Sequence, residues 1–457
     1  MTSSHSEASA NLMQELYFEK LDDLGLLAPL NQVPFQIQQR RNGFRPGQRL
    51  LSLLAAQAQQ CPCLTDWTMA HRLDSRLQHW LGGRRAPHCS TLSRTLAAAD
   101  KETIRVLRQS VLTPVTEQAL LSPQAIGKWV FFDVDNKAIP AEGESYEGTT
   151  TGRMADGGYC RGYRLHLISI DNLWPLEMEF TGANAHAVPS AMVMVKRLVH
   201  RVHGSMRKRM VIRGDSNHGC VQFIRFLGRY DAGYLLKCYN STTARNLWQA
   251  HPDLPRLRVT RPDKPDLLAI DLGLTRINGM TRKKLPNGQE HRRACHMMVP
   301  RVVVYHEDPA QVEPDKTPEC FALFTVLPSS DFAPAELLEQ GYQPRGGDIE
   351  NLFCQLDQAY EITHLRSRTF YGNYTFLMVS LVAATLTQLV RQDAIHADQP
   401  IPPGLQETLV AAAGCGLRLE HHEQTGCVLI TGLRTLYTET FHRALRCACQ
   451  HRFRFVA

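Results

Sequence analysis

The hydrophobic pattern of the first 125 residues is helical. Apolar side chains recur at helical spacing from the start, and Pro46 opens a second such run. Residues 64–81 predict a third helix that stops at Gly82-Gly83, and another helix follows the basic pair Arg84-Arg85. Short helices joined by tight turns can form a DNA-reading helix pair, although an ordinary helical bundle is the commoner arrangement. We expect residues 1–125 to be a helical, DNA-binding region.

From residue 128 the pattern changes to strands. Trp129–Asp135 is an apolar strand that ends in acids, and Tyr163–Asp171 and Leu176–Phe180 follow at hairpin spacing. Ser190–His203 then predicts a helix, and Arg209–Asp215 a further strand that also ends in an acid. This order of three strands, a helix and a strand is typical of a mixed α/β sheet with helices on its faces.

Downstream, the pattern predicts a β-rich insertion and then long helices. Prolines cluster after residue 250, and strand-like runs recur at Tyr234–Tyr239, Leu267–Leu272, Met297–Tyr305 and Phe321–Leu327. The longest apolar stretch, Phe376–Leu386, is far shorter than the ~20 residues that cross a bilayer, so we expect a buried helix. The tail contains a proline-rich linker and a short hairpin. The chain therefore divides into a helical region (1–125), the first part of a core (126–223), a β-rich insertion (224–340), a helical part of the core (341–395) and a tail (396–457).

Composition narrows the class of protein. Of 457 residues, 43% are hydrophobic and 21% are charged, which suits a folded core and excludes a wholly disordered chain. The net charge of +7 favours anionic partners. The 13 cysteines, with no export signal in the first 25 residues, indicate reduced thiols, and the pair Cys61-Pro-Cys63 is spaced too closely for a typical zinc site. We expect a cytoplasmic protein without a membrane segment, and the lack of a Gly-x-x-x-x-Gly-Lys loop predicts no nucleotide cofactor.

Three acidic positions could bring carboxylates together. Asp133 and Asp135 share one face of the first core strand, because side chains alternate along a strand. Asp215 ends a later strand directly after Gly214, and Glu350 lies early in a predicted helix. Clustered carboxylates raise one another's pKa unless a divalent cation such as Mg²⁺ neutralises them, and two ions about 4 Å apart suit phosphodiester chemistry. A single aspartate at a strand end is more often a turn former or a cap, so the pattern of three is what favours a metal site.

The sequence around these acids resembles the Asp-Asp-Glu (DDE) transposases of bacterial insertion sequences. The resemblance covers about residues 45–390 and rests on Phe132-Asp-Val-Asp-Asn136, Ile212-Arg-Gly-Asp-Ser-Asn217 and Tyr342-Gln-Pro-Arg-Gly-Gly-Asp-Ile-Glu-Asn-Leu-Phe353. It is closest to the branch with a β-stranded insertion and a Tyr-Arg-Glu-Lys signature. It implies an α/β fold with an RNase-H-like mixed-sheet core, interrupted by the insertion. It also implies cleavage and joining of DNA with two Mg²⁺ ions, for which Mn²⁺ can substitute.

Position by position, the resemblance implies that Asp135, Asp215 and Glu350 are the catalytic metal ligands, with Asp133 as the alternative to Asp135. Tyr342 and Arg345 match the signature residues that contact DNA near the scissile phosphate.

Two departures from the family pattern leave alternatives open. Four residues separate Arg345 from Glu350 where the family usually has three, so Asp348 is an alternative ligand. Asp357 stands where the family has lysine, and a carboxylate there would repel a phosphate. Either Arg366 or Arg368 substitutes for the lysine, or this copy is an impaired transposase relative that binds DNA as a regulator. A metal-dependent nuclease that cuts without joining is a further alternative.

Basic runs supply candidate DNA contacts. The segment Lys196–Arg213 has no acid, and its Arg207, Lys208 and Arg209 precede Asp215, which suits phosphate contact as well as a solvated helix face. A second basic run in the insertion predicts a hairpin tip that grips DNA; it consists of Arg282, Lys283 and Lys284. Trp248 lies in the same insertion, where relatives stack an aromatic ring on a flipped base, although core packing is the simpler interpretation. The expected partners are DNA, as terminal inverted repeats and target, and a second copy of the chain.

Overall fold

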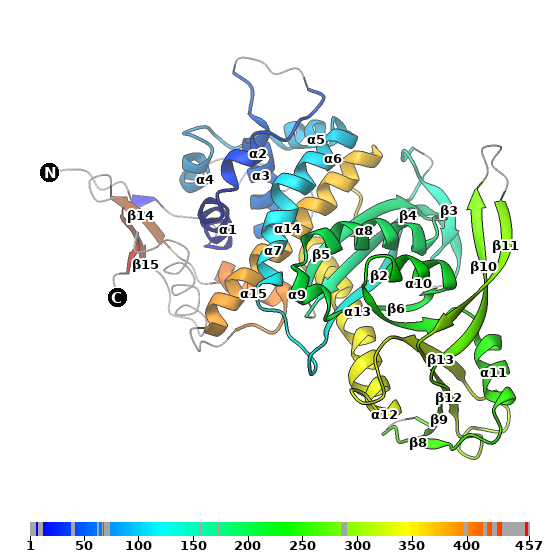
Figure 1. The fold of residues 1–457 in the computed structure, drawn as a ribbon. Helices are drawn as coiled ribbons and strands as arrows, with labels where there is room; N and C mark the ends of the chain where they lie inside the picture. The colour runs from blue at the N-terminus through cyan, green and yellow to red at the C-terminus, as the bar shows by residue number, and fades with distance from the viewer. Residues whose placement is uncertain are drawn as a thin grey trace.

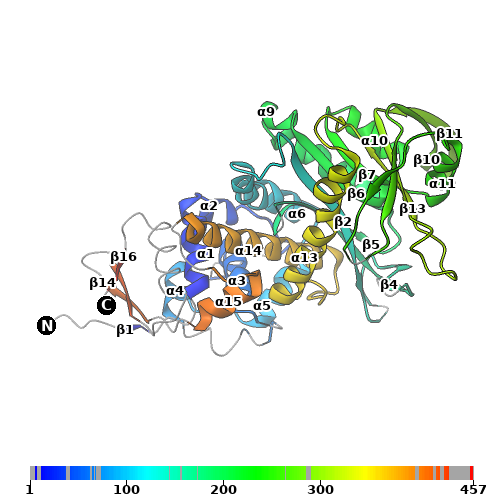
Figure 2. The ribbon, with the colours of Figure 1, turned by 90° about the horizontal axis from the view of Figure 1, so that it is seen from below.

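The computed structural model describes residues 6–7, 12–37, 42–61, 64–65, 67, 74–143, 145–154, 157–171, 173–262, 264–284, 290–396, 401–414, 418–422, 427–431 and 453–455. A helical body and a large mixed sheet lie side by side in both views (Figures 1 and 2). Helix α13 (Gln343–Tyr360) contacts both parts, because it packs on strand β2 (Val130–Pro140) and on helices of the body.

The helical body is built around one long helix, α14 (Phe370–His396). Its segment Phe370–Asp393 is long and apolar enough to cross a membrane by length and composition alone, but its most apolar window is fully buried inside the protein. The expectation of a buried helix here is confirmed. The shorter helices that share the body are α1 (Leu12–Asp23), α2 (Leu27–Leu30), α3 (Pro46–Ala58), α4 (Ser75–Trp80), α5 (Cys89–Ala97), α6 (Lys101–Leu107), η1 (Arg108–Leu112), α7 (Thr113–Glu117), η2 (Gln118–Leu120) and α15 (Leu405–Gly414).

One hydrophobic core joins the first helices to α13 and α14, although more than 200 residues separate them in the chain. The helix expected over residues 64–81 is shorter than predicted. In the part of it that the structure describes, residues 64–65 form a turn and α4 begins only after Asp74. The carboxylate of Asp74 accepts a hydrogen bond from the backbone N–H of Leu77, which is the usual way for an aspartate to start a helix.

Ten strands form a single sheet beside the helical body. Along its main path the order is β3 (Thr150–Arg153), β4 (Tyr159–Ile170), β2, β6 (Met210–Gly219), β7 (Gly233–Cys238), β13 (Cys320–Thr325), β12 (Arg301–Glu307), β9 (Leu267–Asp271) and β8 (Leu257–Val259), and β5 (Trp174–Gly182) also pairs with β4. Strands β2, β6 and β7 are parallel to one another, and the other pairings are antiparallel. The result is the mixed α/β sheet that the sequence predicts.

Alternation along β2 explains how the sheet is covered on both faces. Phe132 and its alternate neighbours enter the core beneath α8 (Ala187–Arg201) and α10 (Val221–Gly228). Phe131 faces the other way, into a core with η3 (Leu337–Tyr342), the π-helical turn that leads into α13. The acids at positions 133 and 135 belong to this second face.

The strands between residues 224 and 340 continue the core sheet. β7 pairs in parallel with β6, and β13, β12, β9 and β8 follow it outward. The run Met297–Tyr305, expected as one strand, is two strands divided at Pro300, because proline has no N–H for a ladder. Its first half belongs to β11 (Glu290–Val299), which forms a separate hairpin with β10 (Thr275–Lys284), seen at the right of Figure 1. The expected tail hairpin is present as β14 (Arg418–His422) and β15 (Cys427–Thr431), in a small sheet with β1 (Ser6–Glu7) and β16 (Phe453–Phe455).

A buried cluster of hydroxyl groups ties three helices of the body together. The Oγ1 atom of Thr387 on α14 lies 2.6 Å from the Tyr17 hydroxyl of α1 and 2.9 Å from the Tyr360 hydroxyl of α13. The two phenol oxygens are themselves 3.2 Å apart. Each helix therefore depends on the others to satisfy a buried polar group.

Replacing Thr387 should destabilise the protein. The substitution Thr387→Val keeps the side-chain volume but leaves two buried phenols short of a partner, so we expect the free energy of unfolding to fall by about 1–3 kcal/mol in urea titrations. Thr375→Val is the matched control on the same helix. The Thr375 hydroxyl is buried without a hydrogen-bond partner among the described residues, so its removal should be neutral or stabilising. Equal losses in the two variants would contradict a role for the cluster.

Candidate active site

Asp135 and Asp215 come together where two parallel strands part. β2 pairs with β6 from Val130↔Met210 to Val134↔Gly214, and the two aspartates are the next residue of each strand. The strands run in the same direction, so both carboxylates lie at one edge of the sheet and are close enough to influence each other's titration.

A local irregularity in β6 presents Asp215. Pairing between β6 and β7 runs to Gly214↔Leu236 and resumes only at Gly219↔Cys238, so the residues between the glycines bulge out of the ladder. A Cβ atom on Gly219 would lie 1.6 Å from the Lys237 carbonyl oxygen, and this closeness explains why glycine stands there. The bulge lets the Asp215 carboxylate accept hydrogen bonds from the Asn217 backbone N–H and side-chain amide.

Two basic side chains hold the acid pair. The Arg345 guanidinium, near the start of α13, donates to Asp135 Oδ2 at 2.7 Å, and its side chain is only 6% exposed. His218, the last residue of the β6 bulge, places Nδ1 2.7 Å from Asp215 Oδ1 and is also buried. Arg345 was expected near the scissile phosphate, and the structure places it on the acid that the resemblance implies as the first ligand.

Burial and the two basic neighbours act in opposite directions on the acid pair. Burial raises the pKa of Asp135, and Asp215 adds to the rise while Arg345 opposes it. Burial also acts on Asp215, but the hydrogen bond and charge of His218, together with Arg345, leave the pKa of Asp215 lowered. Burial raises the pKa of the half-buried Tyr342 to about 12, with a further contribution from the two aspartates, so its hydroxyl stays protonated beside them.

These residues fit a divalent cation. Two carboxylates at one sheet edge supply the oxygen donors that Mg²⁺ prefers, and their mutual repulsion is what such an ion would relieve. Among the residues that the structure describes, no group of three His, Cys, Asp or Glu side chains is arranged to hold a metal ion. The structure therefore brings two of the expected ligands together and does not gather a third.

Glu350 lies on α13 but is exposed. Five residues after Arg345, it projects about 140° around the helix from the guanidinium that touches Asp135. It shares a side of the helix with Asp357, seven residues on, and on that side Asp357 reaches Lys137 of β2. Glu350 thus lies on the exposed side of α13, away from Arg345, and its role as a ligand stays a prediction.

The two alternative acids belong to a different cluster. The Arg213 guanidinium makes paired hydrogen bonds to Asp133, at 2.6 and 2.7 Å, and a third to Asp348 at 3.1 Å. Arg213 also donates to the Gly341 carbonyl and lies over the Phe131 ring. With Asp133 at 2% exposure, this cluster links β2, β6 and α13 within the fold. Asp133 is almost fully enclosed, whereas the side chains of Asp135 and Asp215 are 16% and 26% exposed, so Asp133 is the poorer candidate for a metal ligand. Asp348, at 28% exposure, stays an alternative.

The basic run before Asp215 lies at the wrong end of its strand to reach the acid pair. Arg209 precedes β6 and Asp215 comes directly after the end of its pairing with β2, so about 20 Å of extended chain separates them. The Arg207 and Arg209 guanidinium groups donate to the carbonyls of Val199 and Lys128, whereas Lys208 is exposed. Contact of these residues with DNA away from the acids stays a prediction.

The basic hairpin forms as expected at the level of the backbone. β10 and β11 pair with Arg282 opposite Arg292, Lys283 opposite His291 and Lys284 opposite Glu290. The side chains of these residues lie outside the part of the structure described, so their contact with DNA stays a prediction.

Trp248, on α11 (Ser241–Ala250), is occupied on both sides. The Arg256 guanidinium lies 3.8 Å from its ring centroid, and the His306 ring stacks on it at 5.0 Å. Packing is therefore the role that the structure supports for this residue.

Sequence reasoning missed the histidines around the acids. His218 follows Asp215 by three residues, a spacing that could have been noticed. His166 on β4 could not have been found this way, because only the pairing of β4 with β2, opposite Asn136, brings it close to His218. Burial, with smaller contributions from His218 and Arg164, lowers the pKa of His166 to about 3, so its ring is neutral.

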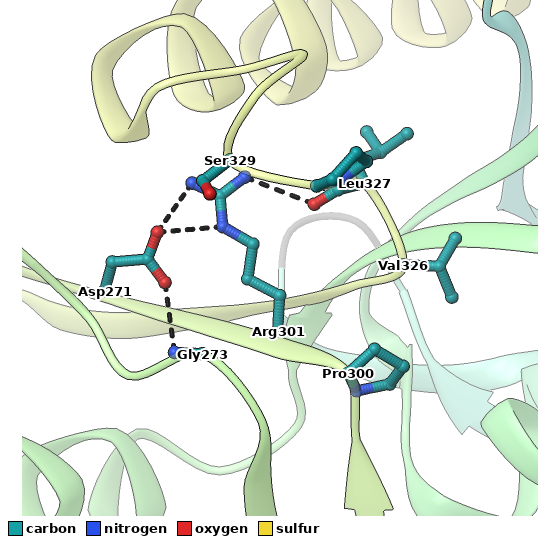
Figure 3. Close-up of a pocket in the computed structure, with 8 residues that line it drawn as sticks. Asp271, Gly273, Pro300, Arg301, Val326, Leu327 and Ser329 are labelled. Atoms are coloured by element: carbon teal, nitrogen blue, oxygen red, sulfur yellow. Dashed lines mark hydrogen bonds and ion pairs between the residues drawn. The ribbon is translucent and has the colours of Figure 1, made fainter.

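A cavity of about 260 Å³ lies elsewhere, between the ends of β9, β12 and β13 (Figure 3). Its charged residues are Arg301 and Asp271, and they satisfy each other through an ion pair of 2.7 Å. Arg301 also donates to the carbonyls of Leu327 and Phe332. The guanidinium is thus committed to the fold, and the cavity offers no free charge to a ligand.

The Arg213 cluster should be structural. Arg213→Gln leaves the buried Asp133 carboxylate without its cation, so we expect the free energy of unfolding to fall by about 3 kcal/mol in urea titrations. Arg105→Gln, which removes an exposed ion pair with Glu102, serves as control and should change little. A stable Arg213→Gln protein would show that the pair contributes no net stability.

His166 should make the protein sensitive to acid. Its pKa falls from 6.5 in the unfolded chain to about 3 in the fold, so below pH 6.5 the unfolded chain takes up a proton that the folded protein excludes. The stability that is fully present above pH 6.5 is then lost as the pH falls towards 3. Melting temperatures measured across this range should fall less steeply for His166→Asn than for the wild type. Parallel curves would show that another group controls the acid sensitivity.

Comparison with known proteins identifies the family to which the chain belongs. The family model for the transposase DDE domain matches residues 128–386, which is more than half of the chain. No curated protein sequence matches. Among solved structures, the chain is similar to that of a piggyBac transposase synaptic complex with hairpin DNA. The identity is 9% and the TM-score 0.44, over 88% of this chain and 79% of that one. The family match spans the strands that carry Asp135 and Asp215 and the helix that carries Glu350, and the chain belongs to the DDE transposases, so its function is that of a DNA transposase.

Proposed function

We propose that the protein cuts and joins the ends of an insertion sequence by metal-dependent phosphodiester chemistry at Asp135, Asp215 and Glu350. The observation that carries the proposal is the meeting of Asp135 and Asp215 at the parting of β2 and β6, inside the segment that matches the DDE domain. Asp215 is close enough to raise the pKa of Asp135, and the two side chains are 16% (Asp135) and 26% (Asp215) exposed. Glu350 is assigned because it lies on α13, the helix that also carries Arg345, and because its exposed carboxylate has no competing ion pair in the described structure.

Each of the residues at the site has a distinct role in this proposal. Asp135 and Asp215 offer carboxylate oxygens to Mg²⁺, or to Mn²⁺ in its place, and Glu350 completes the set. Two such ions, when bound, lower the pKa of the attacking hydroxyl and stabilise the leaving oxygen. His218 holds the orientation of the Asp215 carboxylate through its 2.7 Å hydrogen bond. Arg345 and the protonated Tyr342 lie beside the acids, where they can donate hydrogen bonds to the oxygens of a phosphate.

We also infer the partners and the place of action. The substrate is double-stranded DNA, as the terminal inverted repeats of the element and the target. Two copies of the chain act together, because joining two ends in one event requires both to be held. The exposed Lys208 and the basic residues of the β10–β11 hairpin add affinity that is largely independent of sequence. The protein acts in the cytoplasm of a bacterial cell, on the nucleoid.

Two alternatives share the fold but differ in outcome. A nuclease would cut DNA without joining it. An impaired regulator would bind without cutting, and its main support was Asp357 in place of a lysine. The structure weakens that support, because Asp357 is paired with Lys137 at 3.3 Å and does not face the site as an uncompensated carboxylate.

Loss of any proposed ligand should abolish metal-dependent cleavage and leave folding intact. We expect Asp215→Asn and Glu350→Gln to lower the rate of strand cleavage at least about 100-fold, equivalent to about 3 kcal/mol of transition-state stabilisation. The assay uses the DNA ends that flank the gene, with Mg²⁺ present or withheld, and follows both cut and joined products.

Asp348→Asn is the matched control for the third ligand, since it alters the neighbouring acid on the same helix. If Glu350 is the ligand, Asp348→Asn keeps most of the cleavage activity. The reverse result would transfer the role to Asp348. Cut products without joined products from the wild type would favour the nuclease, and DNA binding without either product would favour the regulator.

A further inference from the structure

A lysine lies one step beyond the acid pair on the same face of β2. Lys137 follows Asp135 by two residues, so their side chains leave the strand on the same side, about 7 Å apart along it. The Lys137 side chain is 26% exposed, so it is partly accessible to solvent. Asp357 is its only polar partner in the described structure, so the ammonium retains further donors.

Asp357 is built to hold this lysine. Its Oδ2 atom lies 3.3 Å from the Lys137 Nζ atom, and its Oδ1 atom accepts hydrogen bonds from the backbone N–H and the hydroxyl of Thr363. Burial alone would raise the pKa of Asp357, but these hydrogen bonds and Lys137 lower it, so the carboxylate is ionised. The carboxylate is thus fixed by the loop after α13, and one oxygen is left to orient the ammonium.

The other basic residues of this region are less suited to reach DNA at the acid pair. Arg366 forms an ion pair with Glu361 and lies over the Phe376 ring, with only 10% of its side chain exposed. Arg368 is exposed, and its carbonyl accepts a hydrogen bond from the Glu147 backbone N–H, but it has no place on the strands that carry the two aspartates. Lys137 is the cation whose strand position ties it directly to Asp135.

We propose that Lys137 binds a phosphate of the same DNA strand next to the one attacked at Asp135 and Asp215, and that Asp357 positions it. A DNA strand carries one phosphate for every ~3.4 Å of helix axis, so a strand laid across the acid pair brings a neighbouring phosphate within reach of Lys137. In this arrangement the Asp357 carboxylate orients Lys137 and does not itself contact the DNA. The inference rests on the proposed function, and it assigns Lys137 as a DNA-binding residue and Asp357 as a positioning residue.

The test separates charge from structure. We would measure the affinity of Lys137→Gln, Lys137→Arg and the wild type for a fluorescently labelled DNA duplex over a range of salt concentrations. Ca²⁺ replaces Mg²⁺ so that binding is measured without cutting. Loss of one phosphate contact should reduce the slope of log K against log salt by about 1 for Lys137→Gln, and Lys137→Arg should restore it. Cleavage with Mg²⁺ should fall in parallel in Lys137→Gln.

Lys128→Gln is the matched control. Lys128 also forms an ion pair with an aspartate, Asp331, but it lies just before β2, at the end of the strand opposite the acids. Its substitution should leave the salt slope unchanged if the DNA lies across the acid edge. Asp357→Asn, which keeps the lysine charge, should retain the salt slope but lower the cleavage rate, since the ammonium is no longer oriented.

The outcomes are distinct. An unchanged slope and normal cleavage in Lys137→Gln, with an active wild type, would overturn the inference and leave the proposed function standing. A slope that falls equally in Lys128→Gln would also overturn it, because the loss would then reflect general charge. A lower slope in a Lys137→Gln protein that melts like the wild type, restored by arginine, would support it. A wild type that never cuts DNA would instead count against the proposed function.

Discussion

The buried contact between Arg213 and Asp133 is the interaction on which the geometry of the site depends. It joins β2 to β6 two residues before each strand delivers its catalytic candidate, and it reaches the start of α13 through Gly341 and Asp348. A guanidinium with two hydrogen bonds to one carboxylate fixes angle as well as distance. The Arg213 contacts therefore hold together β2, β6 and α13, the elements that carry Asp135, Asp215 and Arg345. Asp135 and Asp215 themselves remain partly exposed.

Charge is balanced locally around the acids. Arg345 lies beside Asp135, His218 beside Asp215 and Lys137 beside Asp357, so each of these three carboxylates has a basic side chain next to it. Such pairs keep a cluster of like charges tolerable in the absence of a metal ion. They also leave the polar groups oriented towards one edge of the sheet, where a DNA backbone would supply further negative charge. Asp357, the aspartate on α13 where the family pattern has lysine, takes part in this balance through its ion pair with Lys137.

The helical body contributes rigidity to the same site. α13 stands between the sheet and α14, and its buried side chains belong to the core shared with the first helices of the chain. Because the Tyr17, Tyr360 and Thr387 hydroxyls satisfy one another, the helix that presents Arg345 is anchored at its far end as well. The N-terminal helices therefore stabilise the catalytic region directly, whatever part they take in binding DNA.

Local patterns in the sequence predicted the mixed α/β class, the buried helix α14, the strands β2 and β6 and the two aspartates that follow their pairing, because alternation and helical periodicity are properties of neighbouring residues. The resemblance of three short segments to DDE transposases predicted the family. The partners of the acids were beyond such reasoning: Asp133 and Asp135 look alike in the sequence, and only the packing of Arg213 against one and Arg345 against the other separates them. The same holds for His166, which arrives from another strand, and for Lys137, which meets Asp357 across 220 residues of chain. A carboxylate's role depends on which cation lies within about 3 Å of it, and that distance is decided by the tertiary structure alone.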